Sequence, residues 1–212
     1  MNPNLTEIVC IMDRSGSMAS LREYAINGFN TFVDQQRRLP GEARLTLVLF
    51  NQTYETPIER QPLKTSPALS EAVYVPSGKT ALLDAIGHTI DDLGTKLAAA
   101  PENEKPSKVI ISILTDGVEN SSKSYTRTRV AEMIKLQQEQ YSWQFLFMGA
   151  NQDALAVGQA LNIPPYHAAT FAATSEGTHA AFRGLSRHTS IIRGEPHKRL
   201  GSPGSIQENA LR

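Results

Sequence analysis

Five side chains that offer hard oxygen ligands occur in three separated fragments of the chain. They are Asp13, Ser15, Ser17, Thr80 and Asp116. Carboxylate and hydroxyl oxygens suit divalent cations such as Mg²⁺ or Mn²⁺. The set contains no histidine or cysteine, which disfavours zinc. These residues therefore predict a site for a hard divalent cation, provided that the fold brings the three fragments together.

Apolar runs precede both aspartates. Ile8–Met12 leads directly into Asp13, and Val109–Leu114 ends two residues before Asp116. Short runs that are apolar throughout are typical of strands buried on both faces of a parallel sheet. Because the carboxyl ends of neighbouring parallel strands lie at one edge, both carboxylates are expected there. Thr80 could reach the same edge from the start of a helix.

Strands and helices alternate along the rest of the chain. Further strands are expected at residues 45–50, 54–59, 143–148 and 167–171, and helices at 20–39, 80–99, 128–140, 154–161 and 175–187. This alternation favours an α/β fold with a doubly wound, mostly parallel, open Rossmann-like sheet and helices on both faces. Ser20 and Glu23 match a capping box at the first helix, so Ser15 and Ser17 are not needed as caps.

One domain is expected over residues 1–193. The remaining segment, residues 194–212, is rich in glycine and proline and has few apolar residues. Such a segment cannot bury enough apolar surface to offset the entropy of ordering it. Residues 194–212 are therefore expected to form a flexible tail.

Composition and charge exclude several classes of protein. The 212 residues contain 21 Lys and Arg and 21 Asp and Glu, so the formal net charge is zero. The chain thus lacks the basic excess that accompanies binding to nucleic acid or anionic membranes. No signal peptide and no apolar run of membrane-spanning length is evident. The chain is therefore expected to be cytoplasmic. Its single cysteine, Cys10, precludes an internal disulfide.

The order of the three fragments matches a known motif. Asp13-Arg14-Ser15-Gly16-Ser17, followed by Thr80 and then Asp116, resembles the metal-ion-dependent adhesion site of von Willebrand factor A (vWA) domains. Thr80–Leu82 and Leu114–Gly117 supply matching context. The resemblance covers about residues 5 to 190, fills all five motif positions, and is greatest to stand-alone bacterial or phage members of the family.

The resemblance implies how such a site would act. Ser15, Ser17 and Thr80 would coordinate Mg²⁺ or Mn²⁺ directly, and the aspartates would act largely through water. An ion held mainly by neutral ligands favours an additional carboxylate from outside. The implied function is metal-dependent binding of a protein partner that presents a Glu or Asp side chain, without catalysis and without a nucleic-acid or membrane partner.

Simpler interpretations exist for each residue alone. Aspartates after strands commonly form turns, and Thr80 could be a helix cap. A second function class, a metal-dependent hydrolase or phosphotransferase, could use the same ion. The sequence shows no evident base beside the serines and few carboxylates for a catalytic metal pair, which weighs against it. Ser77–Thr80 also lacks the first glycine of a phosphate-binding loop.

Four polar loop residues are expected to border the same edge of the sheet. They are Glu119, Asn120, Asn151 and Asp153. Each could cap a helix or form a turn, and each could equally shape a partner-binding surface. The sequence leaves these two roles open.

Overall fold

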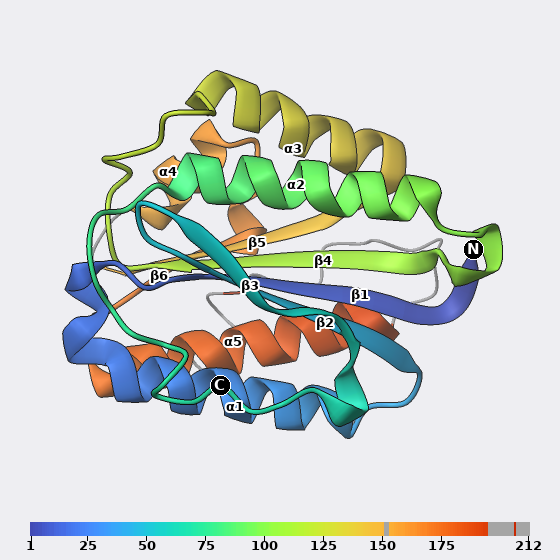
Figure 1. Cartoon of the computed structure of the whole chain (residues 1–212), viewed down its shortest axis with the longest axis horizontal. Coiled ribbons are helices and arrows are strands. Elements are labelled where there is room, and N and C mark those ends of the chain that lie inside the picture. Colours follow the sequence, from blue (N-terminus) through green and yellow to red (C-terminus); the bar gives the residue numbers. More distant parts are fainter. Residues whose placement is uncertain (151–152, 195–205, 207–212) are drawn as a thin grey trace.

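The computed structural model of the chain describes residues 1–150, 153–194 and 206. Their strands form one sheet of six strands in the order β3-β2-β1-β4-β5-β6 (Figure 1). The strands are β1 (Asn2–Asp13), β2 (Glu42–Phe50), β3 (Tyr54–Pro62), β4 (Pro106–Thr115), β5 (Gln144–Ala150) and β6 (Ala168–Phe171). Only the edge strand β3 pairs antiparallel with its neighbour. The prediction of a mostly parallel, doubly wound α/β sheet is therefore confirmed.

The register places the ends of the two central strands side by side. In the parallel pair β1 and β4, Met12 lies opposite Leu114. Asp13 is the last residue of β1, and Asp116 follows the last residue of β4. Both aspartates therefore lie at the carboxyl edge of the sheet, on adjacent strands.

Helices cover both faces of the sheet. They are α1 (Arg22–Arg37), α2 (Leu82–Ala99), α3 (Arg127–Tyr141), α4 (Ala154–Ala160) and α5 (Ser175–Gly194). Figure 1 shows α1 and α5 on one face and α2 and α3 on the other. In β1, Ile8, Cys10 and Met12 join the apolar cluster under α1 and α5, and Val9 and Ile11 join the cluster under α2 and α3. This burial on both faces explains why the strand is apolar throughout.

The start of the first helix differs from the prediction. Residues Gly16–Leu21 form a 3₁₀ helix, and α1 begins only at Arg22. Its cap position is Leu21, which makes no side-chain capping hydrogen bond, so the capping box of Ser20 and Glu23 is wrong. The 3₁₀ turn buries Met18 and Leu21, and this packing sets the path of the chain before the α-helix starts.

Other element boundaries shift by smaller amounts. Helix α2 begins at Leu82 and leaves Thr80 in the preceding loop, while α5 continues to Gly194. The predicted tail lies mainly outside the described residues. Ile206, which is described, is buried against the cluster under α1 and α5. None of the helices in the described part of the chain has the length and apolar character needed to cross a membrane.

Candidate metal centre

The carboxylate of Asp13 is buried at the end of β1. It accepts a hydrogen bond from the backbone N–H of Ser15 (2.6 Å) and another from the hydroxyl of Thr115 (2.6 Å). Thr115 is itself fully buried at the end of β4. These two donors fix the Asp13 carboxylate within the first loop and against the neighbouring strand.

A chain of hydrogen bonds joins this loop to the second aspartate. The Ser15 and Ser17 hydroxyl oxygens are 3.0 Å apart, and the Ser17 hydroxyl donates to Asp116 Oδ1 over 2.7 Å. Ser15 is buried, whereas Ser17 is exposed. The two serines therefore lie between the two carboxylates, with Ser17 on the solvent side.

Thr80 completes the group from the loop before α2. A Cβ atom placed on Gly117 would lie 2.8 Å from the Thr80 hydroxyl oxygen and 3.6 Å from Asp13 Oδ2. Both side chains therefore border Gly117, a position where a larger residue would displace the Thr80 hydroxyl. The structure thus brings all five predicted residues together at one edge of the sheet.

The two carboxylates lie in an environment that disfavours their negative charge. Burial raises the pKa of Asp13 to about 6; hydrogen bonds from Thr115 and Ser15 oppose this change, and the charge of Asp116 adds to it. Burial also raises the pKa of Asp116, and the hydrogen bond from Ser17 opposes that change. A bound cation would stabilise both ionised carboxylates.

The donor set fits a hard cation. It consists of two carboxylates and three hydroxyls, all oxygen ligands of the kind that Mg²⁺ and Mn²⁺ accept. Within the described residues, no group of three or more His, Cys, Asp or Glu side chains is placed to hold a metal ion. A site here would consequently depend on the hydroxyl groups as well as on the carboxylates.

The Thr80 loop is held by the loop after Asp116. The Thr80 N–H donates to Asn120 Oδ1, and the Asn120 N–H donates to the Thr80 carbonyl, both over 3.0 Å. The Glu119 carboxylate accepts the N–H of Leu83 (2.9 Å) in the first turn of α2. The cap of α2 therefore comes from a distant loop, and its cap position is Ala81, not Thr80.

The polar loop residues expected to border this edge cap helices and form turns wherever the structure describes them. Glu119 and Asn120 form capping and turn contacts, and Asp153 caps α4 by accepting the N–H of Ala156 over 3.0 Å. Asn151 lies outside the described residues. The hydrogen bonds of Glu119, Asn120 and Asp153 are therefore those of helix caps and turns, the first of the two roles that the sequence left open.

Sequence reasoning missed a buried tyrosine beneath the site. The hydroxyl of Tyr74, a fully buried side chain, donates to the carbonyl of Asp13. Burial, together with the charges of Asp13 and Asp116, raises the Tyr74 pKa well above its ordinary value, so the group stays a neutral donor. Tyr74 lies in an irregular segment rich in Pro and Ser, where no periodic pattern could indicate its burial.

Comparison with known proteins gives a structural match but no match in sequence. No protein-family model matches the chain, and no curated protein matches it. Among solved structures, the vWF domain of the type V pili tip protein Mfa5 from Porphyromonas gingivalis has a TM-score of 0.65 and 11% identity, covering 90% of this chain and 97% of that one. The pilus adhesin SpaC from Lactobacillus rhamnosus GG has a TM-score of 0.66 and 13% identity, covering 90% of this chain and 30% of SpaC.

A third match is proximal thread matrix protein 1 from the mussel byssus, solved with a zinc-occupied metal-ion-dependent adhesion site (MIDAS) motif. Its TM-score is 0.63 at 13% identity, with 89% of this chain and 49% of the mussel chain covered. The present chain thus spans about half the length of the mussel protein. At such low identity the structural likeness shows the fold alone, and the chain has the fold of von Willebrand factor A domains.

Proposed function

We propose that the chain is a divalent-metal-dependent protein-binding module without catalytic activity. In this proposal Asp13, Ser15, Ser17, Thr80 and Asp116 hold Mg²⁺ or Mn²⁺, and a Glu or Asp side chain of a partner protein completes the coordination. The observation that carries the proposal is the gathering of these two carboxylates and three hydroxyls where β1 and β4 end.

The balance of charge supports an acidic partner. Three of the five candidate ligands are neutral, and the Asp13 carboxylate is already engaged by two hydrogen bonds inside the protein. A bound ion would supply positive charge at an edge where Ser17 is open to solvent. A carboxylate from another protein matches that charge, and the pilus adhesin and the mussel protein with its occupied MIDAS motif are neighbours of the same fold.

The hydrolase alternative needs a base beside a nucleophile. For Ser15 and Ser17, the hydroxyl contacts that the structure describes are with each other and with the carboxylates of Asp116 and Asp13. The acceptors are carboxylates, which the proposal assigns to the metal ion, and none of the partners is a histidine or lysine. This arrangement favours a binding role over the activation of a serine or a water molecule.

Metal binding provides the first test. Replacing Asp116 with Asn removes one negative charge while keeping the size of the side chain, so affinity for Mn²⁺ should fall by at least about tenfold. Asp34→Asn is the matched control, because Asp34 is an exposed carboxylate on α1 that pairs with Arg37. Calorimetry and water-proton relaxation with Mn²⁺, repeated with Mg²⁺ and Zn²⁺, measure the effect. Equal binding by Asp116→Asn and the wild type would refute the site.

Partner capture and turnover separate the two function classes. The wild-type protein should retain a host protein in Mg²⁺ and release it in EDTA, and Asp116→Asn should not retain it. Incubation with p-nitrophenyl phosphate and p-nitrophenyl acetate should give no metal-dependent product. Metal-dependent turnover that Asp116→Asn abolishes would instead support the hydrolase.

A further inference from the structure

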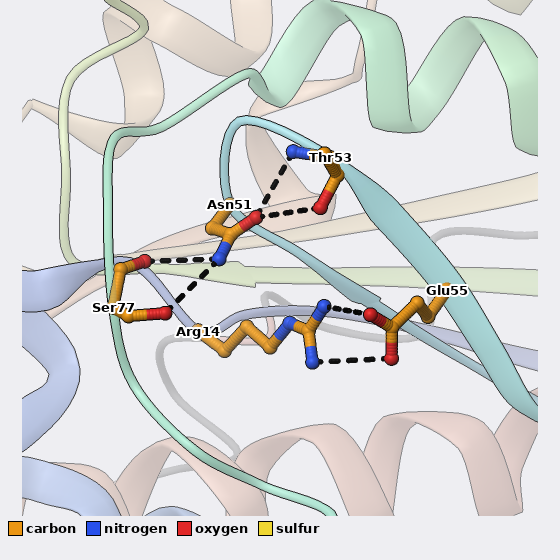
Figure 2. Close-up of polar contacts among 5 residues, drawn as sticks. All are labelled: Arg14, Asn51, Thr53, Glu55 and Ser77. Carbon is orange, nitrogen blue, oxygen red and sulfur yellow. Dashed lines mark hydrogen bonds and ion pairs between the residues drawn. The ribbon is translucent and has the colours of Figure 1, made fainter.

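The turn between β2 and β3 contacts the loop that carries Thr80. The Asn51 side-chain amide donates to the carbonyl of Ser77 (3.0 Å) and lies 3.3 Å from its hydroxyl, as Figure 2 shows. The backbone carbonyl of Asn51 accepts the N–H of Ala81 (2.8 Å), and the side-chain oxygen Gln52 Oε1 accepts the backbone N–H of Lys79 (2.8 Å). These contacts reach the loop at residues 77, 79 and 81 and therefore hold the backbone on both sides of Thr80.

The orientation of the Asn51 amide is determined within the turn itself. Its Oδ1 accepts hydrogen bonds from the Thr53 N–H (2.9 Å) and the Thr53 hydroxyl (3.0 Å). The backbone N–H can only donate and therefore requires the oxygen on that side, so the NH₂ group faces Ser77. Asn51 is buried. An aspartate would keep the acceptor for Thr53 but would lose the donor toward Ser77.

The same hairpin also holds the loop that carries the two serines. The Arg14 N–H donates to the carbonyl of Phe50 (2.7 Å), and the Arg14 guanidinium makes a bidentate pair with Glu55 at 2.6 and 3.2 Å (Figure 2). Bidentate pairs of this kind fix orientation as well as distance. Strand β3, at the edge of the sheet, is thereby connected to the Asp13–Ser17 segment.

Backbone hydrogen bonds join the two loops directly. The Ser77 N–H donates to the carbonyl of Arg14 (2.8 Å), and the Gly16 N–H donates to the carbonyl of Gly78 (3.0 Å). Gly78 has a φ of +76°, and a Cβ there would lie 1.7 Å from Gln52 Oε1. The Gln52 side chain thus packs directly over the backbone of this loop.

We propose that Asn51 and Gln52 are positioning residues of the candidate metal centre. They hold the 77–81 backbone against the β2–β3 turn and thereby keep the Thr80 hydroxyl beside Asp13. The inference rests on the proposed metal site. Ligands must be held within a fraction of an ångström of the productive geometry, and the groups that orient them influence affinity for that reason.

The test compares variants on the two sides of the Asn51 amide. Asn51→Asp removes the donor toward Ser77 and should weaken Mn²⁺ binding by roughly ten- to a hundredfold, although it adds negative charge near the site. Thr53→Val, the matched control, removes only the hydroxyl on the turn side. The Thr53 backbone N–H still holds the Asn51 oxygen in place, so this variant should bind Mn²⁺ as the wild type does. Gln52→Ala, at an exposed position, should weaken binding in the same direction.

The readouts are the Mn²⁺ dissociation constant and the water-proton relaxation enhancement per bound ion, with circular dichroism and thermal melts as checks of folding. The proposal is supported if Asn51→Asp and Gln52→Ala are folded and bind Mn²⁺ more weakly than the wild type, while Thr53→Val binds it with wild-type affinity. If Asn51→Asp does not fold, Gln52→Ala decides. Wild-type affinity in both variants overturns the positioning role and leaves the metal site intact. An absence of Mn²⁺ binding by the wild type overturns the metal site and this inference together.

Discussion

Asn120 holds the peptide groups of Thr80 on both sides. Its side-chain oxygen accepts the Thr80 N–H, and its own N–H donates to the Thr80 carbonyl. Only the first contact depends on the side chain. Thr80 is 3% exposed, so water has little access to replace a lost partner. A single carboxamide therefore contributes to the stability of the loop that carries a candidate ligand.

Replacing this carboxamide should have a measurable cost. Asn120→Ala removes the acceptor of the Thr80 N–H and should lower the free energy of unfolding by about 1 kcal/mol. Asn120→Asp keeps an acceptor at the same position and should be closer to the wild type. Urea denaturation in EDTA measures both without a contribution from metal. If the alanine variant is as stable as the wild type, the hydrogen bond does not support the loop.

At the scale of elements, a buried pair of histidines joins α5 to the segment that precedes β6. His188 of α5 and His167, at the end of the 3₁₀ helix η4 (Pro165–His167), have ring centroids 4.9 Å apart at 89°. Burial lowers the pKa of His167 to about 3, helped by the charge of His188, and burial lowers the pKa of His188 to about 4. Both rings are thus neutral in the folded state near pH 7.

This pair should make the folded state sensitive to acid. Between about pH 6.5 and pH 4 the unfolded chain binds protons that the folded chain excludes, so the free energy of unfolding decreases as the pH falls. Asp13 and Glu7, whose pKa values are raised by burial, act in the opposite direction. The difference between the wild type and His188→Gln isolates the histidine contribution.

Denaturant melts from pH 7.5 to pH 4 test this prediction. His188→Gln should lose less stability over that range than the wild type, by on the order of 2–3 kcal/mol. His179→Gln, at an exposed position on α5, is the control and should follow the wild type. An unchanged pH dependence in His188→Gln would contradict a buried, neutral His188.

At the scale of the whole molecule, the core and the candidate metal centre are separate. Apolar clusters on the two faces of the sheet are built from α1 and α5 on one side and from α2 and α3 on the other. The five candidate ligands lie at the edge where the strands end, outside both clusters. Burial of apolar surface, which is the main driving force of folding, does not depend on them.

Removal of metal should therefore leave the fold intact. Chelation removes only the linkage free energy, about 2.7 kcal/mol for an ion present at 100 times its dissociation constant. Thermal melts and circular dichroism in Mg²⁺ and in EDTA should show a modest fall in melting temperature and no loss of secondary structure. Asp116→Asn, which binds the ion more weakly, should show a smaller difference between the two conditions than the wild type. Unfolding on chelation would indicate a structural metal instead.

The sequence by itself determined the fold class, the central strands and the identity of the candidate ligands. Ile8–Met12 and Val109–Leu114 are apolar throughout because both of their faces are buried, and this leaves a pattern that can be read locally. The prediction that Asp13 and Asp116 lie at one edge followed from the parallel arrangement of those strands. The metal ion, the acidic partner, the cytoplasmic location and the bacterial or phage type stay predictions.

Tertiary structure alone decided how the candidate ligands are held. The hydrogen bond between Tyr74 and Asp13 joins residues 61 positions apart in the chain. Those between Asn51 and Ser77 and between Glu119 and Leu83 span 26 and 36 positions. The helix cap expected from Ser20 is likewise absent, because the packing of the preceding 3₁₀ turn determined where α1 begins. Hydrogen bonds between distant segments depend on the folded path of the backbone, and neither hydrophobic periodicity nor local capping propensity encodes that path.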